Sequence, residues 1–266
     1  MKGILSLLSA ILVFMLCAPA GAHHEVQHRL PPLLRDVAFE QHLGESIALD
    51  LVFRDEAGET VRLGDYFGTR PVILTMAYYN CPMLCGLVLD GLAQSLRQLR
   101  FTLGEQFVVV TVSFDPRETP AHAAAKKVQA LRSYARPGTA AGWHFLTGEE
   151  ASIRQLTQAV GFRYAYDADN RQFAHAAGLL VLTPQGRIAR VLFGIEFTPM
   201  DVRLALVEAS AGQIGSPVDQ LLLFCSQYDP TTGQYGLVIM NVLRLAGLMV
   251  VVALGGFMIV MFRRER

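Results

Sequence analysis

An apolar segment that runs directly into a pair of cysteines restricts the fold of this chain more than any other feature. Residues 72–79 are almost entirely apolar and predict a buried strand. Cys81 and Cys85 follow at once, with Pro82 between them. Because proline suits the first position of a helix, we expect Cys81 to be the N-cap of a helix that begins at Pro82.

The residues after the cysteines predict a helix that packs on the strand. Apolar side chains recur there at intervals of three and four residues: Leu84, Leu87, Val88, Leu92, Leu96 and Leu99. One helical turn separates the two cysteines, so their Cα atoms should lie about 6 Å apart, a distance that allows a disulfide. The same spacing allows two thiolates to bind one metal ion. A helix N-terminus favours the thiolate, most strongly at Cys81. Two unrelated core cysteines are the remaining interpretation.

The first 22 residues have the pattern of a secretory signal peptide. Lys2 precedes an apolar run over residues 4–16, and small residues follow over 18–22. On this interpretation Cys17 is removed with the signal. The alternative is an N-terminal anchor that is retained.

An apolar stretch near the C-terminus predicts a transmembrane helix over residues 237–262. Residues 245–262 contain no charged side chain and would span about 27 Å as a helix, against a hydrocarbon core of about 30 Å. Arginines in the tail, residues 263–266, predict that this end is cytoplasmic. With the signal peptide, this places the globular part on the periplasmic side of a bacterial inner membrane, an oxidising compartment. A buried core helix is the alternative.

The order of the remaining elements predicts an α/β sandwich of the thioredoxin type over residues 47–212, between a leader (23–46) and a juxtamembrane segment (213–236). Two strands (47–53 and 60–63) form an N-terminal β-hairpin extension before a helical turn at 63–67. The elements expected after the cysteine helix are a strand at 107–114, a helix at 120–134 capped by Thr119, a strand at 143–146, a helix at 149–160, a hairpin of 177–182 with 187–193, and a helix at 200–210. The formal net charge is zero, which gives no electrostatic case for a nucleic-acid partner.

Three motifs occur in an order and spacing that resemble the SCO/SenC family. They are the Cys-x3-Cys pair, the segment 112–120 in which Asp115 precedes proline, and the pair Phe173 and His175. The resemblance covers roughly residues 47–210. It implies a membrane-anchored, thioredoxin-fold copper protein that helps to metallate cytochrome c oxidase, notably its dinuclear copper site. The chain departs from the family at Met83 and Leu84, where an acidic or polar residue is usual, and in carrying its anchor at the C-terminus.

Carried over residue by residue, the resemblance implies that Cys81, Cys85 and His175 are the copper ligands. Two thiolates and an imidazole suit Cu(I) and can also hold Cu(II). We expect His175 in a loop that enters the C-terminal hairpin, and Asp115 to contribute indirectly at most. His42, His122 and His144 have no comparable support and are interpreted as structural.

The leading hypothesis is therefore a copper chaperone that passes copper to an apo-cytochrome c oxidase subunit in the same membrane. The alternative is a thiol–disulfide reductase that keeps copper-ligand cysteines of the oxidase reduced, with Cys81 attacking and Cys85 resolving. A peroxidase of the peroxiredoxin type is a weaker third hypothesis. Cys225 is left over, and is interpreted as a buried inert thiol, an additional copper- or client-facing thiol, or half of an intermolecular disulfide.

Overall fold

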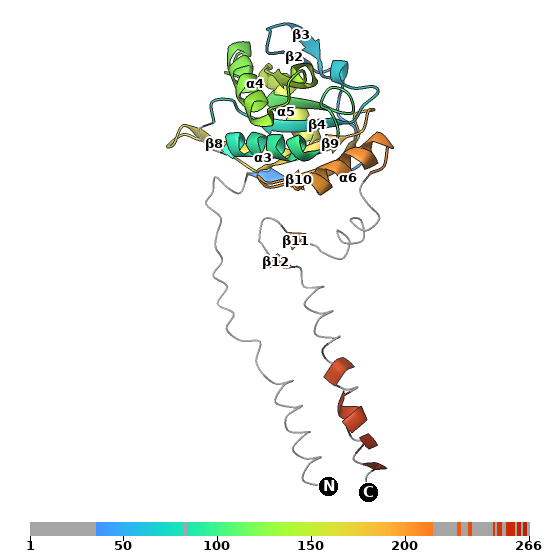
Figure 1. The fold of residues 1–266 in the computed structure, drawn as a ribbon. Helices are drawn as coiled ribbons and strands as arrows, with labels where there is room; N and C mark the ends of the chain where they lie inside the picture. The colour runs from blue at the N-terminus through green and yellow to red at the C-terminus, as the bar shows by residue number, and fades with distance from the viewer. Residues whose placement is uncertain are drawn as a thin grey trace. The chain divides into compact units, whose positions relative to one another are not determined.

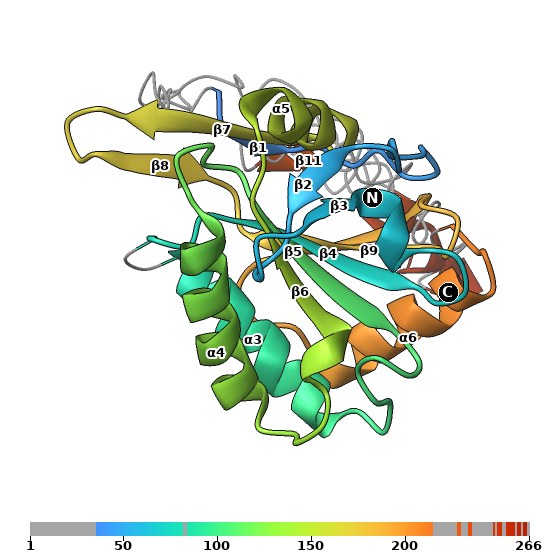
Figure 2. The ribbon, with the colours of Figure 1, turned by 90° about the horizontal axis from the view of Figure 1, so that it is seen from above.

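A five-stranded sheet forms the centre of the fold (Figures 1 and 2). The computed structural model describes residues 36–81 and 84–214, and beyond them 228–229, 234–235, 247, 249–251, 254–258, 260–261 and 263–264. In spatial order the strands are β10 (Ile188–Phe193), β9 (Gly178–Leu182), β4 (Val72–Ala77), β5 (Val108–Ser113) and β6 (Trp143–Leu146). β4, β5 and β6 run parallel, while β9 is antiparallel to β4 and forms a hairpin with β10.

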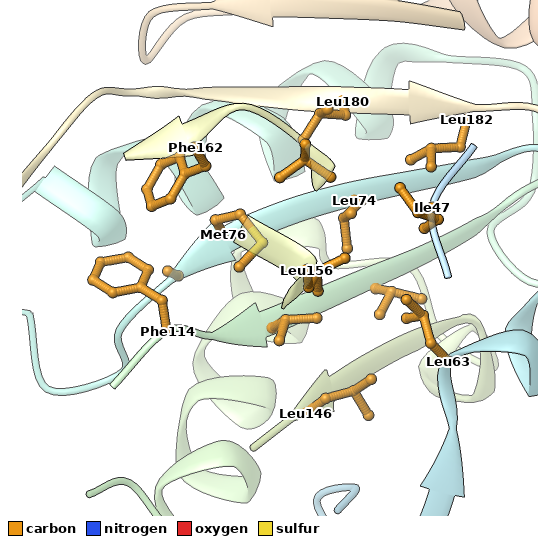
Figure 3. Close-up of a cluster of buried hydrophobic side chains, with 14 of the residues drawn as sticks. Ile47, Leu63, Leu74, Met76, Phe114, Leu146, Leu156, Phe162, Leu180 and Leu182 are labelled. Carbon is orange, nitrogen blue, oxygen red and sulfur yellow. The ribbon is translucent and has the colours of Figure 1, made fainter. Parts of the chain in front are cut away.

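Both faces of this sheet are covered, which is why its central strands are mostly apolar. Every residue of β4, β5 and β9 is buried. Figure 2 shows the helices α3 (Leu84–Gln98), α4 (Pro120–Tyr134) and α6 (Pro199–Ser210) on one side, with α5 (Glu150–Ala159) on the other. Figure 3 shows the core on the α5 side, where Leu74 and Met76 of β4 lie among side chains from other elements, such as Phe114, Leu146 and Leu156.

A second, three-stranded sheet lies on the α5 side and was not predicted. It consists of β1 (Ala38–Phe39), β7 (Phe162–Asp167) and β8 (Gln172–His175), with β7 in the middle and both pairings antiparallel. Asp167 stabilises the turn between β7 and β8, because its carboxylate accepts hydrogen bonds from the backbone N–H groups of Asp169 and Asn170. His175 is therefore the last residue of a strand, and the expectation that it lies in a loop was wrong.

The N-terminal β-hairpin is confirmed, but its first strand is shorter than predicted. β2 (Val52–Arg54) pairs with β3 (Thr60–Arg62), followed by the 3-10 turn η1 (Leu63–Tyr66). Residues 47–51 form no strand because their backbone groups are bonded elsewhere: Ile47 N–H donates to Gly186 O, and Gly64 N–H donates to Leu49 O. A Cβ atom on Gly64 would lie 2.9 Å from that Leu49 oxygen, so the close approach requires glycine.

The other predicted elements of the domain are confirmed to within one or two residues at each end. Thr119 is the N-cap of α4, as predicted. The prediction that Leu87 belongs to the buried face of α3 was wrong. Leu87 is 45% exposed, and the buried face instead includes Leu89 and Ala93. A 3-10 turn, η2 (Ala140–Gly142), precedes β6, and the short strands β11 (Tyr228–Asp229) and β12 (Gln234–Tyr235) pair with each other.

Several predictions fall on residues outside the described part of the chain. These are the signal peptide, most of the leader, the N-terminal helical position of Pro82, and Cys225. The predicted span at 237–262 is described only in pieces. Among the described residues, no helix has the length and apolar character that crossing a bilayer requires.

Candidate metal centre

Two cysteines and one histidine meet where strand β4 ends and helix α3 begins. Cys81 lies in the connection between these elements and is half-buried, while Cys85 is the second described residue of α3 and is buried. His175 comes from the end of β8 on the α5 side. One potential ligand atom from each of the three lies within 4.8 Å of the other two. The structure thus brings together all three residues predicted as ligands.

The Cys85 sulfur is the central contact of this group. It lies 3.2 Å from Nε2 of His175 and accepts a hydrogen bond from the backbone N–H of Tyr78 at 3.4 Å. The backbone N–H of Cys85 in turn donates to the Cys81 sulfur at 3.3 Å. Each sulfur atom therefore accepts from one backbone N–H, that of Tyr78 just after β4 in one case and that of Cys85 at the start of α3 in the other, and such donors favour thiolates.

Burial outweighs these donors at Cys85. Desolvation raises the pKa of the Cys85 thiol well above its usual value, and its hydrogen bond with Cys81 raises it further. The expectation that the helix start favours the thiolate was therefore wrong for Cys85 in the metal-free protein. A bound cation would replace that proton, and its positive charge would compensate the negative charge of the buried thiolate.

The ring of His175 is held in the orientation that a metal ligand needs. Its Nδ1 atom lies 2.9 Å from the carbonyl oxygen of Ala176. A carbonyl only accepts hydrogen bonds, so we assign the proton of the neutral ring to Nδ1. The lone pair is then on Nε2, which faces Cys85. Metal-binding histidines are commonly oriented by such a bond from the other ring nitrogen.

Aromatic rings enclose the imidazole. The ring centroids of Phe114, Phe162 and Tyr78 lie 5.2, 5.9 and 6.0 Å from that of His175. Phe114 follows β5 and Phe162 begins β7, so the residues of this enclosure come from three parts of the chain. An apolar enclosure of this kind limits access of water to the imidazole side of the site.

A buried carboxylate, which the sequence analysis missed, shapes the backbone just before Cys81. Glu118 is only 7% exposed. One of its oxygens accepts from Tyr79 N–H at 2.7 Å and from the Ser113 hydroxyl at 2.6 Å, and the other accepts from Asn80 N–H at 2.7 Å. The only signal for Glu118 in the sequence is its place in the segment 112–120, three residues after Asp115.

Asp115 forms a bidentate ion pair with Arg117, two residues further along the chain. Its carboxylate accepts two hydrogen bonds from the Arg117 guanidinium, at 2.8 and 2.7 Å. The guanidinium carbon lies 5.2 Å from the ring centroid of Tyr166 and 5.4 Å from that of Phe173, on the two strands of the β7–β8 hairpin. Asp115 was expected to contribute indirectly at most, and its contact with Arg117 is the route that the structure offers for such a contribution.

The histidines interpreted as structural have other partners. His42 lies 3.1 Å from the carbonyl oxygen of Ala159, and His122 accepts from the backbone N–H of its N-cap, Thr119. The ring of His144 packs against that of Tyr66 at a tilt of 41°, beside a cavity of about 190 Å³ near the start of β4 and β5. Burial lowers the pKa of His144.

Comparisons with known proteins agree with this architecture. The SCO1/SenC family model matches residues 40–206. A solved structure of a proposed electron transfer protein from Aquifex aeolicus VF5 is 25% identical, with a TM-score of 0.56 over 64% of this chain and 95% of that one. None of the curated proteins matches the chain.

Two further solved structures show the range of these similarities. BsSco, described as a member of the Sco family of cytochrome c oxidase assembly proteins with a disulfide switch, is 17% identical, with a TM-score of 0.50 over 65% of this chain and 98% of that one. Copper-bound ScoI of Arabidopsis thaliana is 17% identical, with a TM-score of 0.48 over 62% of this chain and 99% of that one. Since the family model matches more than half of its residues, and the fold agrees, this chain belongs to the SCO1/SenC family.

Proposed function

We propose that this protein is a copper chaperone that binds one copper ion through Cys81, Cys85 and His175 and delivers it during assembly of cytochrome c oxidase. The observation that carries the proposal is the convergence of two sulfurs and one imidazole nitrogen within 4.8 Å. Membership of the SCO1/SenC family agrees with copper as the cargo.

The donor set favours copper over zinc. Thiolate ligands select soft ions such as Cu(I), and an imidazole allows Cu(II) to be held as well. A structural zinc site normally has four protein ligands in a tetrahedron. In the described residues the group consists of three, with no carboxylate or second imidazole among them. A three-ligand site also suits a carrier, because an incoming ligand from the client can bind before the original ligands leave.

The two sulfurs differ in exposure, which gives the site a direction for transfer. Cys85 is 1% exposed, whereas Cys81 is half-buried and so the more accessible of the two. We propose that a client thiolate or imidazole approaches copper on the Cys81 side. The client is an apo-cytochrome c oxidase subunit, and we place the exchange on the periplasmic side of the inner membrane, with residues 237–262 as the anchor. A shared membrane would raise the effective concentration of client and chaperone.

Anaerobic titration of the reduced full chain with Cu(I) tests the proposal. We expect one equivalent to bind tightly, and oxidation to Cu(II) to give a thiolate-to-copper charge-transfer band. Absence of a one-equivalent site would refute the metal assignment. An apo-oxidase subunit in the same membrane should then acquire the copper from the loaded protein.

Thiol–disulfide exchange is the second candidate function, and the same difference in exposure supports it. A half-buried thiol next to a buried one is the arrangement of an attacking and a resolving cysteine. In this role Cys81 would reduce a disulfide of the client, and Cys85 would then form a disulfide with Cys81. Replacement of His175 separates the two functions, because thiol exchange does not need the imidazole.

A further inference from the structure

The loop between β5 and α4 contacts both ligand-bearing segments of the metal centre through adjacent residues. Glu118 hydrogen-bonds the backbone that leads into Cys81. Arg117 reaches the other way, over the rings of Tyr166 and Phe173 on the β7–β8 hairpin. The cysteine side and the histidine side are therefore both in contact with one short loop, in addition to the Cys85–His175 contact itself.

The register of the hairpin shows how the Arg117 contact bears on His175. Tyr164 pairs with His175, and Tyr166 pairs with Phe173, so these four side chains project from the same face of the two strands. Phe114 packs on this face at the inner pair, with ring centroids 4.6 Å from Tyr164 and 5.2 Å from His175. Arg117 covers the next pair outward, one pleat repeat further along the hairpin.

The Arg117 guanidinium is itself held in place. Asp115 accepts from its Nε and Nη2 atoms at 2.8 and 2.7 Å, and Asp115 is 5% exposed. A bidentate pair of this kind fixes the plane of a guanidinium and leaves its face free to stack on aromatic rings. The Arg117 side chain is 62% exposed, yet its ion pair with the buried carboxylate of Asp115 fixes its orientation.

We propose that Arg117 is a positioning residue for His175: anchored on Asp115, it holds the β7–β8 hairpin against the body of the domain so that the imidazole stays within reach of the two sulfurs. The hairpin carries His175 at the end of β8, so loosening Phe173 and Tyr166 loosens the ligand as well. The metal-binding consequence rests on the proposed copper function, whereas the effect on the hairpin does not.

The test compares Arg117→Gln with Arg163→Gln in the full chain in detergent micelles. Arg163 is a matched control because it is on the same hairpin, is 52% exposed, and also pairs with a carboxylate, Glu40, at 3.5 Å. It lies next to Tyr164 and so projects from the opposite face of β7. Both variants lose one exposed positive charge, but only one loses the contact with the aromatic pair.

We expect Arg117→Gln to speed amide hydrogen exchange of residues 172–175 in the metal-free protein and to weaken Cu(I) binding by roughly three- to tenfold. Arg163→Gln should leave both unchanged. In the His175→Ala background, Arg117→Gln should weaken Cu(I) binding no further, because its effect passes through the imidazole. The Cu(II) form of Arg117→Gln should also show weaker nitrogen hyperfine coupling.

Unchanged exchange of residues 172–175 in Arg117→Gln would overturn the inference, as would an equal loss of Cu(I) affinity with and without His175. The inference would also be overturned if Arg117→Gln sped amide exchange in β4 and β5 as much as in residues 172–175, since that result indicates general destabilisation. If the unsubstituted protein binds no copper, the proposed function fails, and the exchange experiment still decides whether Arg117 holds the hairpin.

Discussion

The Sγ atom of Cys85 lies 3.2 Å from Nε2 of His175, although ninety positions separate the two residues in the chain. One comes from the start of a helix on the main sheet, and the other from the end of a strand in the small sheet. Burial raises the pKa of Cys85 and the assigned tautomer of His175 leaves a lone pair on Nε2, so we assign the thiol proton of the metal-free protein to this contact. The same geometry accepts a soft cation once that proton leaves.

Replacement of His175 by alanine should weaken Cu(I) binding by more than the roughly 10- to 100-fold that loss of an outer-shell partner costs. The two thiols should still oxidise to a disulfide, because they keep their own contact. Competition with a Cu(I) chelator measures the affinity, and His122→Ala is the matched control, since His122 only caps α4. Unchanged affinity in His175→Ala would remove the imidazole from the ligand set.

The two cysteines should differ in reactivity towards an alkylating reagent in the reduced, metal-free protein. Cys81 is half-buried and should react first, whereas Cys85, which is 1% exposed and has a raised pKa, should react only as the protein opens. Mass spectrometry of peptides from a time course measures both rates. Bound Cu(I) should protect both thiols, and faster labelling of Cys85 would contradict the assignment of Cys81 as the accessible side.

Much of the main sheet could be predicted from the sequence because local pattern and tertiary packing agree there. The strands β4 and β5 are apolar on both faces, and α4 carries both a capping threonine and a first-turn proline. The cysteine pair was predicted as a site for the same reason: its spacing has a meaning within one helical turn. In such segments the chemistry of neighbouring residues is sufficient to determine the element.

The β7–β8 hairpin could not be predicted in this way. Polar and apolar residues alternate only imperfectly along its two strands, and most of these residues are half-buried. The face that is covered packs on aromatic rings from distant segments of the chain, which the local sequence does not reveal. The roles of Arg117 and Glu118 were missed for a related reason. Each depends on a partner about forty or more positions away, Phe173 in one case and the backbone of Tyr79 in the other. Only the tertiary structure brings those partners together.

Copper affinity should fall steadily as the pH is lowered from about 9 through the neutral range. The pKa of Cys85 is raised above its usual value of about 9, so this thiol is protonated throughout that range and must release its proton when copper binds. Each unit of pH should then lower the apparent affinity by up to about tenfold for each proton released. Cu(I) competition titrations from pH 6 to pH 8 measure the slope. A flat profile would mean that both thiols are already ionised.

Replacement of Glu118 by glutamine should lower both the stability of the domain and its affinity for copper. The two carboxylate oxygens accept from Tyr79 N–H and Asn80 N–H, while an amide offers one oxygen and turns its own N–H donors towards a second donor. Of these two donors the one on Tyr79 is buried, and leaving a buried N–H without an acceptor costs about 1–3 kcal/mol. Urea unfolding measures this loss, and Cu(I) competition measures the affinity.

Glu150→Gln is the matched control for that substitution. Glu150 is 71% exposed and pairs with Arg154 at 3.8 Å on the surface of α5, so its loss should change stability by less than about 0.5 kcal/mol. The Glu118 hydrogen bonds fix the backbone that leads into Cys81. The Glu118→Gln variant should therefore lose copper affinity even without urea, where nearly all molecules are folded. Full affinity in a folded Glu118→Gln protein would show that this carboxylate stabilises the fold without positioning the sulfur.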